Sequence, residues 1–143
     1  MKKLKLNVIL STTLILGVVT LLSSCSKSIT FQKSVVVPSA VGTVKIGKDD
    51  NGNRQVTIKV ENLVAPSRLT PERKLYIVWV QTKDNGTKSL GKLVSSEAWF
   101  SSERNAKFIS VLNYDPVRFF ITAENDADVT NPSGVTVIST SDF

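Results

Sequence analysis

The 143-residue chain contains no histidine and one cysteine, Cys25. These two scarcities exclude the Ser-His-Asp and Cys-His nucleophile systems, and they exclude the usual zinc sites, which need imidazole or several thiolates. Carboxylates, lysines and tyrosines remain as candidate catalytic groups. We therefore expect no metal, no cofactor and no enzymatic activity.

The sequence also lacks any run of basic residues beyond its first few positions. Lysine and arginine outnumber aspartate and glutamate by 18 to 12, for a net charge of +6. Three of these lysines, Lys2, Lys3 and Lys5, stand at the N-terminus. Because no basic stripe interleaved with aromatics is visible, we expect no nucleic-acid partner.

The N-terminus has the three parts of a secretory signal. The three lysines precede an uncharged apolar stretch over residues 6–22, and Ser23 and Ser24 supply the small residues of a cleavage site. The apolar stretch is short for a stable membrane span, and polar residues such as Asn7 weaken it further. We therefore predict that residues 1–24 are a signal peptide.

The tetrapeptide Leu22-Ser23-Ser24-Cys25 resembles the bacterial lipobox, in which the cysteine is acylated and becomes the first residue of the mature protein. The resemblance implies a lipoprotein with acyl chains such as palmitate on Cys25, which would hold it at a membrane almost permanently. Ser26 replaces the aspartate that retains lipoproteins at the inner membrane, so we expect the outer membrane, facing the periplasm. The alternatives are an uncleaved membrane anchor, or an ordinary secretory signal with an incidental cysteine.

Cleavage before Cys25 would leave 119 residues with a net charge of +3, the size of one domain. Residues 25–32 are polar and show no repeat, so we expect a lipidated tether there. One β-sandwich domain is expected over residues 33–143. A chain of this length buries enough surface to be stable without disulfides or metals.

The domain sequence consists of short β-rich segments separated by turn residues. Apolar and polar residues alternate over residues 56–61 and 117–124, which is typical of half-buried strands. Residues 75–80 are apolar throughout and indicate a central strand. Shorter candidate strands cover residues 34–38, 43–48, 88–94, 107–112 and 135–140.

Turn residues complete the fold prediction. Asn51-Gly52 and Asn85-Gly86 each predict a type I′ hairpin between antiparallel neighbours. Residues 64–74 contain two prolines and are the expected crossover between sheets, with one helical turn starting at Thr70. The pattern predicts an all-β fold, an antiparallel immunoglobulin-like β-sandwich of about seven or eight strands.

Two Asx-rich segments, residues 49–53 and 125–128, suggest calcium loops at first sight. Counting from Asp49, the sixth and twelfth positions of an EF-hand loop hold Arg54 and Val60 instead of glycine and glutamate. We therefore expect both segments to be polar turns rather than metal sites.

The aromatic residues point to an alternative function. Trp79 lies in the most apolar segment and is predicted to be in the core. Trp99, Phe100 and Tyr114 would make a carbohydrate-contacting or adhesion module if they are exposed together.

The carboxylates point to a second alternative, an envelope hydrolase. Glu97 with Glu103, or Asp115 with Glu124, would need to face each other across a cleft at about 5 to 9 Å. Solvated charges on strands and turns explain these residues adequately, so no catalytic residue is assigned.

Four motifs of the second half occur in a set order. They are Tyr76-Ile77-Val78-Trp79-Val80, Leu90-Gly91-Lys92-Leu93, Phe119-Phe120-Ile121-Thr122-Ala123-Glu124 and Pro132-Ser133-Gly134-Val135-Thr136-Val137-Ile138. Their order over residues 75–139 resembles the extracytoplasmic C-terminal domain of the anti-sigma-K factor family. The resemblance implies a β-sandwich fold. It does not extend to the cytoplasmic zinc-binding domain of that family, so it does not imply the regulatory activity.

Together these observations predict a lipid-anchored cell-envelope lipoprotein with a non-enzymatic binding or structural role. We expect its partners to be the membrane, through Cys25, and an envelope protein or glycan.

Overall fold

The computed structural model describes residues 26–96 and 105–143. Within them the chain forms nine strands and one 3-10 helical turn, and no α-helix. The predicted signal peptide and Cys25 lie outside the described residues. So do Trp99, Phe100, Glu97 and Glu103.

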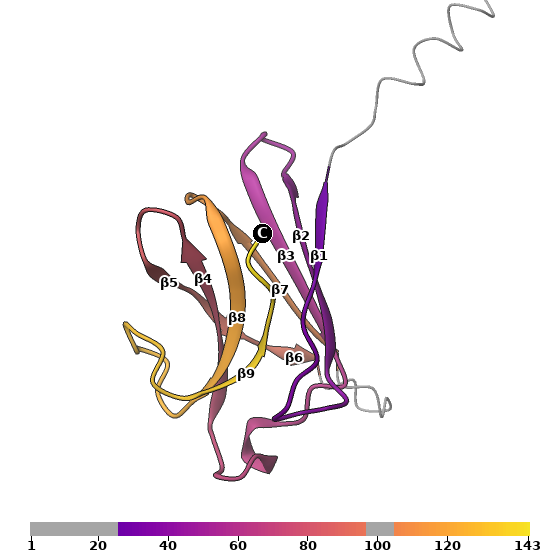
Figure 1. Cartoon of the computed structure of the whole chain (residues 1–143), viewed down its shortest axis with the longest axis vertical. Coiled ribbons are helices and arrows are strands. Elements are labelled where there is room, and N and C mark those ends of the chain that lie inside the picture. The colour runs from indigo at the N-terminus through magenta and orange to yellow at the C-terminus, as the bar shows by residue number, and fades with distance from the viewer. Residues whose placement is uncertain (1–25, 97–104) are drawn as a thin grey trace, which may run out of the picture.

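Two antiparallel sheets pack face to face (Figure 1). The first sheet has the strand order β1-β2-β3-β7-β6, and the second has β5-β4-β8-β9. The strands are β1 (Lys27–Thr30), β2 (Val41–Lys48), β3 (Arg54–Glu61), β4 (Leu75–Thr82), β5 (Thr87–Leu93), β6 (Ser95–Ser96), β7 (Asn105–Val111), β8 (Pro116–Glu124) and β9 (Val135–Ser139).

The connectivity is that of an immunoglobulin-like sandwich. Strands β2, β3, β7 and β6 take the places of immunoglobulin strands A, B, E and D, and β5, β4, β8 and β9 those of C′, C, F and G. The predicted all-β, immunoglobulin-like sandwich is therefore confirmed, with β1 as an additional edge strand.

The core lies between the two sheets, where strands of both sheets bury apolar side chains. Val44 of β2, Ile58 of β3, Val78 of β4 and both Phe119 and Ile121 of β8 are fully buried there. Burial of such side chains is the main source of stability in a domain without disulfides.

Both Asn-Gly pairs join antiparallel neighbours, β2 with β3 and β4 with β5, as predicted. The predicted turn type is wrong, because φ is positive at Gly52 and Gly86 but not at the asparagines that precede them. In the first hairpin, the Asp49 carboxylate accepts hydrogen bonds from the backbone N–H groups of Asn51 and Asn53. This side-chain bonding stabilises a wider turn.

The expected tether is largely part of the fold. Lys27–Thr30 form β1, which pairs with β2 along the edge of the first sheet. Ile29 packs against the core, and this contact holds the strand in place. The chain then passes to the second sheet, where the backbone N–H of Gln32 donates to the carbonyl of Ser139 at 2.8 Å.

Two further local predictions are wrong. Residues 34–38 form bends instead of a strand, because the Ser34 hydroxyl accepts a hydrogen bond from the Val37 N–H and donates to the Val137 carbonyl. The helical turn expected from Thr70 is absent from the described crossover, which contains the short 3-10 turn η1 (Pro66–Arg68) instead.

Candidate functional site

The two described candidate catalytic carboxylates are far apart. Asp115 precedes the first residue of β8, and Glu124 is the last of its nine residues, so nine steps of an extended strand, about 30 Å, separate them. Asp115 is exposed and forms an ion pair with Arg54 at 2.7 Å. This pair of carboxylates therefore cannot act on one substrate, and the pair Glu97 and Glu103 lies outside the described residues.

Glu124 belongs to a buried polar network at the end of β8. The Trp79 indole N–H donates to the Thr122 hydroxyl at 2.8 Å, and this hydroxyl donates to Glu124 Oε1 at 2.7 Å. The backbone N–H and hydroxyl of Ser133 donate to Oε1 and Oε2 at 3.1 and 2.8 Å. Both carboxylate oxygens are thus engaged in fastening the β8–β9 loop.

Three of the four motifs that carry the family resemblance meet in this network. Trp79 comes from the first, Thr122 and Glu124 come from the third, and Ser133 comes from the fourth. Because these contacts join the end of β8 to the start of β9, the network has a structural role.

Trp79 is fully buried, as predicted. It lies on the face of the second sheet that points away from the core, however, because its neighbours Val78 and Val80 point into the core. There it stacks on Phe120 with ring centroids 6.3 Å apart. Trp79 is therefore not available as a sugar-stacking surface.

Tyr114 is the described member of the predicted aromatic surface. It is half-buried, and its carbonyl oxygen accepts a hydrogen bond from Arg54 at 3.0 Å. Trp99 and Phe100 lie outside the described residues, so the carbohydrate-contacting surface stays a prediction.

The two Asx-rich segments are turns. Besides the two backbone N–H groups, the Asp49 carboxylate accepts a hydrogen bond from the Asn53 side chain at 3.0 Å, and this bond leads those that lower the pKa of Asp49. In the β8–β9 loop, the Asp126 carboxylate accepts from the Asp128 N–H. No group of three or more His, Cys, Asp or Glu side chains among the described residues is arranged to hold a metal.

The outer face of the first sheet carries a set of lysines from three strands. Lys45 of β2, Lys59 of β3 and Lys107 of β7 are exposed, and they lie opposite the core because residues next to them point inward. Strand register places Lys59 directly beside Lys107, and Thr57 beside Lys45. We call the outward side chains of these strands the lysine face, which comprises Val41, Thr43, Lys45, Gln55, Thr57, Lys59, Glu61, Asn105, Lys107, Ile109 and Val111.

The lysine face has a net positive charge, because it carries the three lysines and one carboxylate, Glu61. Like charges directly opposite each other on a sheet destabilise it, and Lys59 and Lys107 are such a pair. Within the described ranges, Arg54 and Asp115 form the ion pair closer than 4 Å, and the three lysines have no carboxylate at that distance. The face is therefore suited to bind negative charge from outside the molecule.

Aliphatic side chains accompany the lysines. Val41, Ile109 and Val111 are 55%, 50% and 47% exposed on the same face. At one end of the face, a groove of about 420 Å³ is lined by Lys59, Glu61 and Lys33 together with the apolar residues around Val41. The face thus combines cationic groups with apolar surface.

Sequence reasoning missed the lysine face because its members are far apart in the chain. Lys45 and Lys59 occupy polar positions of alternating strands, and the Asn51-Gly52 hairpin brings them to one face. The alternation and the hairpin turn that place Lys45 and Lys59 on one face could both be read from the sequence. The pairing of β3 with β7, which adds Lys107 to the face, could not be read from the sequence.

No family model, curated protein or solved structure matches the chain. Among the residues that the structure describes, no helix is both long and apolar enough to cross a membrane. The geometry of these residues is therefore the basis for assigning a function.

Proposed function

We propose that the protein is a cell-envelope lipoprotein, anchored by acyl chains on Cys25, whose β-sandwich has a non-enzymatic binding or structural role at the membrane surface. The observation that carries the proposal is the position of β1. The fold begins at Lys27, so Ser26 is the one residue between Cys25 and the first strand.

This short connection restricts where the domain can act. Two Cα–Cα steps span about 7 Å at most, so a lipid on Cys25 holds the sandwich against the membrane instead of at the end of a stalk. The residue after the cysteine, Ser26, supports the outer membrane, facing the periplasm. The resemblance to the extracytoplasmic domain of anti-sigma-K factors supports an envelope location, without the regulatory activity.

The arrangement of the described carboxylates supports a non-enzymatic role. Asp115 and Glu124 lie at opposite ends of β8, and both oxygens of Glu124 accept hydrogen bonds from the protein itself. A general acid or base needs to reach a proton of the substrate, which the buried Glu124 does not, and the exposed Asp115 is paired with Arg54 instead of a second carboxylate.

The anchor is tested by replacing the cysteine in cells fed with labelled palmitate. Cys25→Ala should abolish fatty-acid labelling and leave an unprocessed precursor, because the thiol is the acylated group. Ser24→Ala is the matched control and should be labelled and processed normally, since it keeps a small residue before the cysteine. Label on the Cys25→Ala protein would show that the proposed anchor is wrong.

A further inference from the structure

We propose that the lysine face lies against the anionic phospholipid headgroups of the membrane that carries the anchor. This inference rests on the proposed function for the attachment through Cys25. It adds the orientation of the domain and the class of lipid that the domain recognises.

Strand register brings the lysine face to the anchor. Strand β1 is the edge strand of the first sheet, and Ser28 lies directly beside Lys45 of β2. Three residue steps from Cys25 to Ser28 and one strand spacing to Lys45 amount to about 15 Å between the Cα atoms of Cys25 and Lys45 at most. An acyl chain on Cys25 therefore keeps this face within reach of the bilayer.

The chemistry of the face matches an anionic bilayer surface. Lipid phosphates can be approached by Lys45, Lys59 and Lys107. Each lysine close to an anionic leaflet raises the membrane-binding constant about fivefold. Ile109 and Val111 lie on β7 beside these lysines, where exposed aliphatic groups can enter the interfacial layer. The lipid phosphates then form the ion pairs that Lys59 and Lys107 do not form within the described part of the chain.

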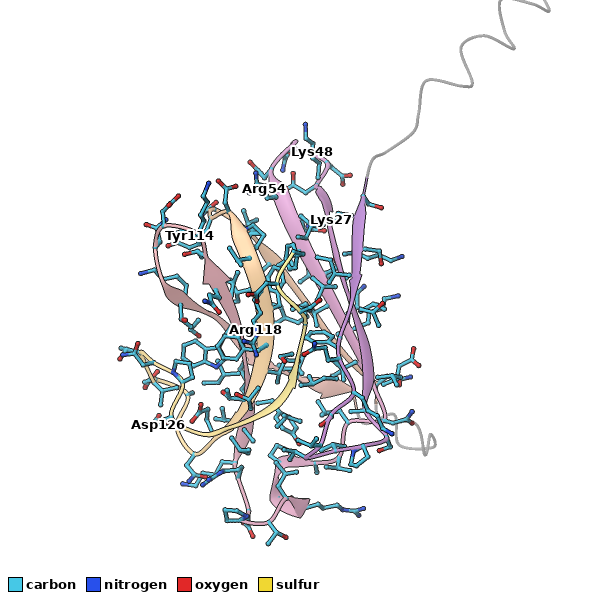
Figure 2. All side chains as sticks on the ribbon, viewed as in Figure 1. Lys27, Lys48, Arg54, Tyr114, Arg118 and Asp126 are labelled. Atoms are coloured by element: carbon cyan, nitrogen blue, oxygen red, sulfur yellow. The ribbon has the colours of Figure 1, made fainter. Side chains whose placement is uncertain are left out.

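Other charges of the molecule agree with this orientation. Asp126 in the β8–β9 loop lies on the far side of the sandwich from β1 and β2 (Figure 2), so the acidic loop would point away from the membrane. Glu61 is the carboxylate of the lysine face itself, at the end of β3 opposite Val41, and the three lysines outnumber it.

An acidic glycan or protein would satisfy the same charges, but the membrane is favoured. The anchor makes contact with the bilayer an intramolecular event, whose effective concentration is far above that of a partner that must arrive from solution. A weakly attractive face is enough to set the orientation under these conditions.

The test measures lysine acetylation by mass spectrometry while the protein is held on vesicles. The chain from Cys25 onward contains every described strand, and its Cys25 thiol is coupled to a maleimide lipid. The result is then independent of whether cells acylate Cys25, which the labelling experiment decides separately. Vesicles of phosphatidylcholine alone are compared with vesicles that also contain phosphatidylglycerol.

We expect Lys45, Lys59 and Lys107 to be acetylated at least about fivefold more slowly on the anionic vesicles, and high salt should abolish the difference. Lys74 and Lys92, which are exposed elsewhere, should react equally on both. Equal rates for the three lysines on both vesicles would overturn the proposal. Protection by a soluble polyuronate, but not by phosphatidylglycerol, would overturn it in favour of an acidic glycan.

Matched variants test the orientation itself. Neutron reflectometry on a supported anionic bilayer gives the thickness of the protein layer, which should increase in K45Q/K59Q/K107Q because the sandwich is no longer held by its face. The control R68Q/K74Q/K92Q removes the same charge from other exposed positions and should keep the wild-type thickness. An unchanged layer in the first variant would contradict the proposal.

Discussion

Glu124 makes the stability of the sandwich depend on pH. Burial raises the pKa of this carboxyl, but the hydrogen bonds from Thr122, Gly134 and Ser133 outweigh burial and lower it. A carboxyl whose pKa is lower in the folded than in the unfolded state stabilises the fold above the unfolded pKa. This contribution is lost as the pH falls through the folded pKa.

We therefore expect the free energy of unfolding to decrease below about pH 4.5, the ordinary pKa of a glutamate, measured by urea denaturation at pH 7 and pH 3. Glu124→Gln should be less stable than the wild type by about 1 to 3 kcal/mol at pH 7, because an amide cannot accept all of these hydrogen bonds. It should also lose less stability on acidification. If the free energy of unfolding of Glu124→Gln depended on pH as strongly as that of the wild type, other carboxyls would be responsible for the pH dependence.

Trp79 is the largest fully buried side chain of the described residues. Trp79→Ala should lower the free energy of unfolding by about 3 to 5 kcal/mol, through lost burial and the resulting cavity. Trp99→Ala, in a serine-rich segment, should cost clearly less. Urea denaturation of both variants provides the comparison, and equal losses would contradict the predicted difference.

At the residue scale, the sequence predicted which residues are buried better than it predicted the sheet face they occupy or the residues they contact. The apolar run around Trp79 correctly predicted burial. It could not show which face Trp79 occupies, because a run that is apolar at every position has no alternation. Likewise, Glu124 was identified only as a possible member of a carboxylate pair, since its partner Ser133 comes from the following loop.

At the scale of elements, the start of β9 depends on a glycine. A Cβ atom at Gly134 would overlap the carbonyl oxygen of Ala123 and lie 2.8 Å from Glu124 Oε2. Gly134→Ala should therefore cost about 3 kcal/mol or more, because backbone atoms must move. Gly52→Ala is the control: its φ is +82° but its surroundings are open, so about 1 kcal/mol is expected. Similar urea midpoints for the two variants would contradict this close packing.

Strands in which apolar and polar residues alternate strongly were predictable from the sequence, whereas segments whose conformation depends on tertiary contacts were not. Strand β3 matches its predicted alternation. Strand β1 has four residues and one inward apolar side chain, Ile29, which is too little for a local signal. Residues 34–38 contain three valines and favour a strand by propensity, but the hydrogen bonds of Ser34 determine the bend.

At the scale of the whole molecule, the melting temperature should not respond to calcium. A ligand that binds the folded state raises the melting temperature, but the Asp49 carboxylate is occupied by hydrogen bonds from its own turn. The melting temperature of residues 26–143 should thus be the same in millimolar calcium and in chelator. An increase of several degrees with calcium would indicate a site and favour a calcium-dependent adhesion module.

The position of β1 also has a mechanical consequence. Where Cys25 is anchored, a force that pulls the domain from the membrane acts first on the ladder between β1 and β2 and then on the bond from Gln32 to Ser139. Detaching β1, residues 27–30, would lengthen the connection by about 14 Å while Phe31 stays in the core. If Cys25 is the anchor, we expect β1 to detach under tension before the core unfolds, because one ladder with β2 and the side chain of Ile29 hold it.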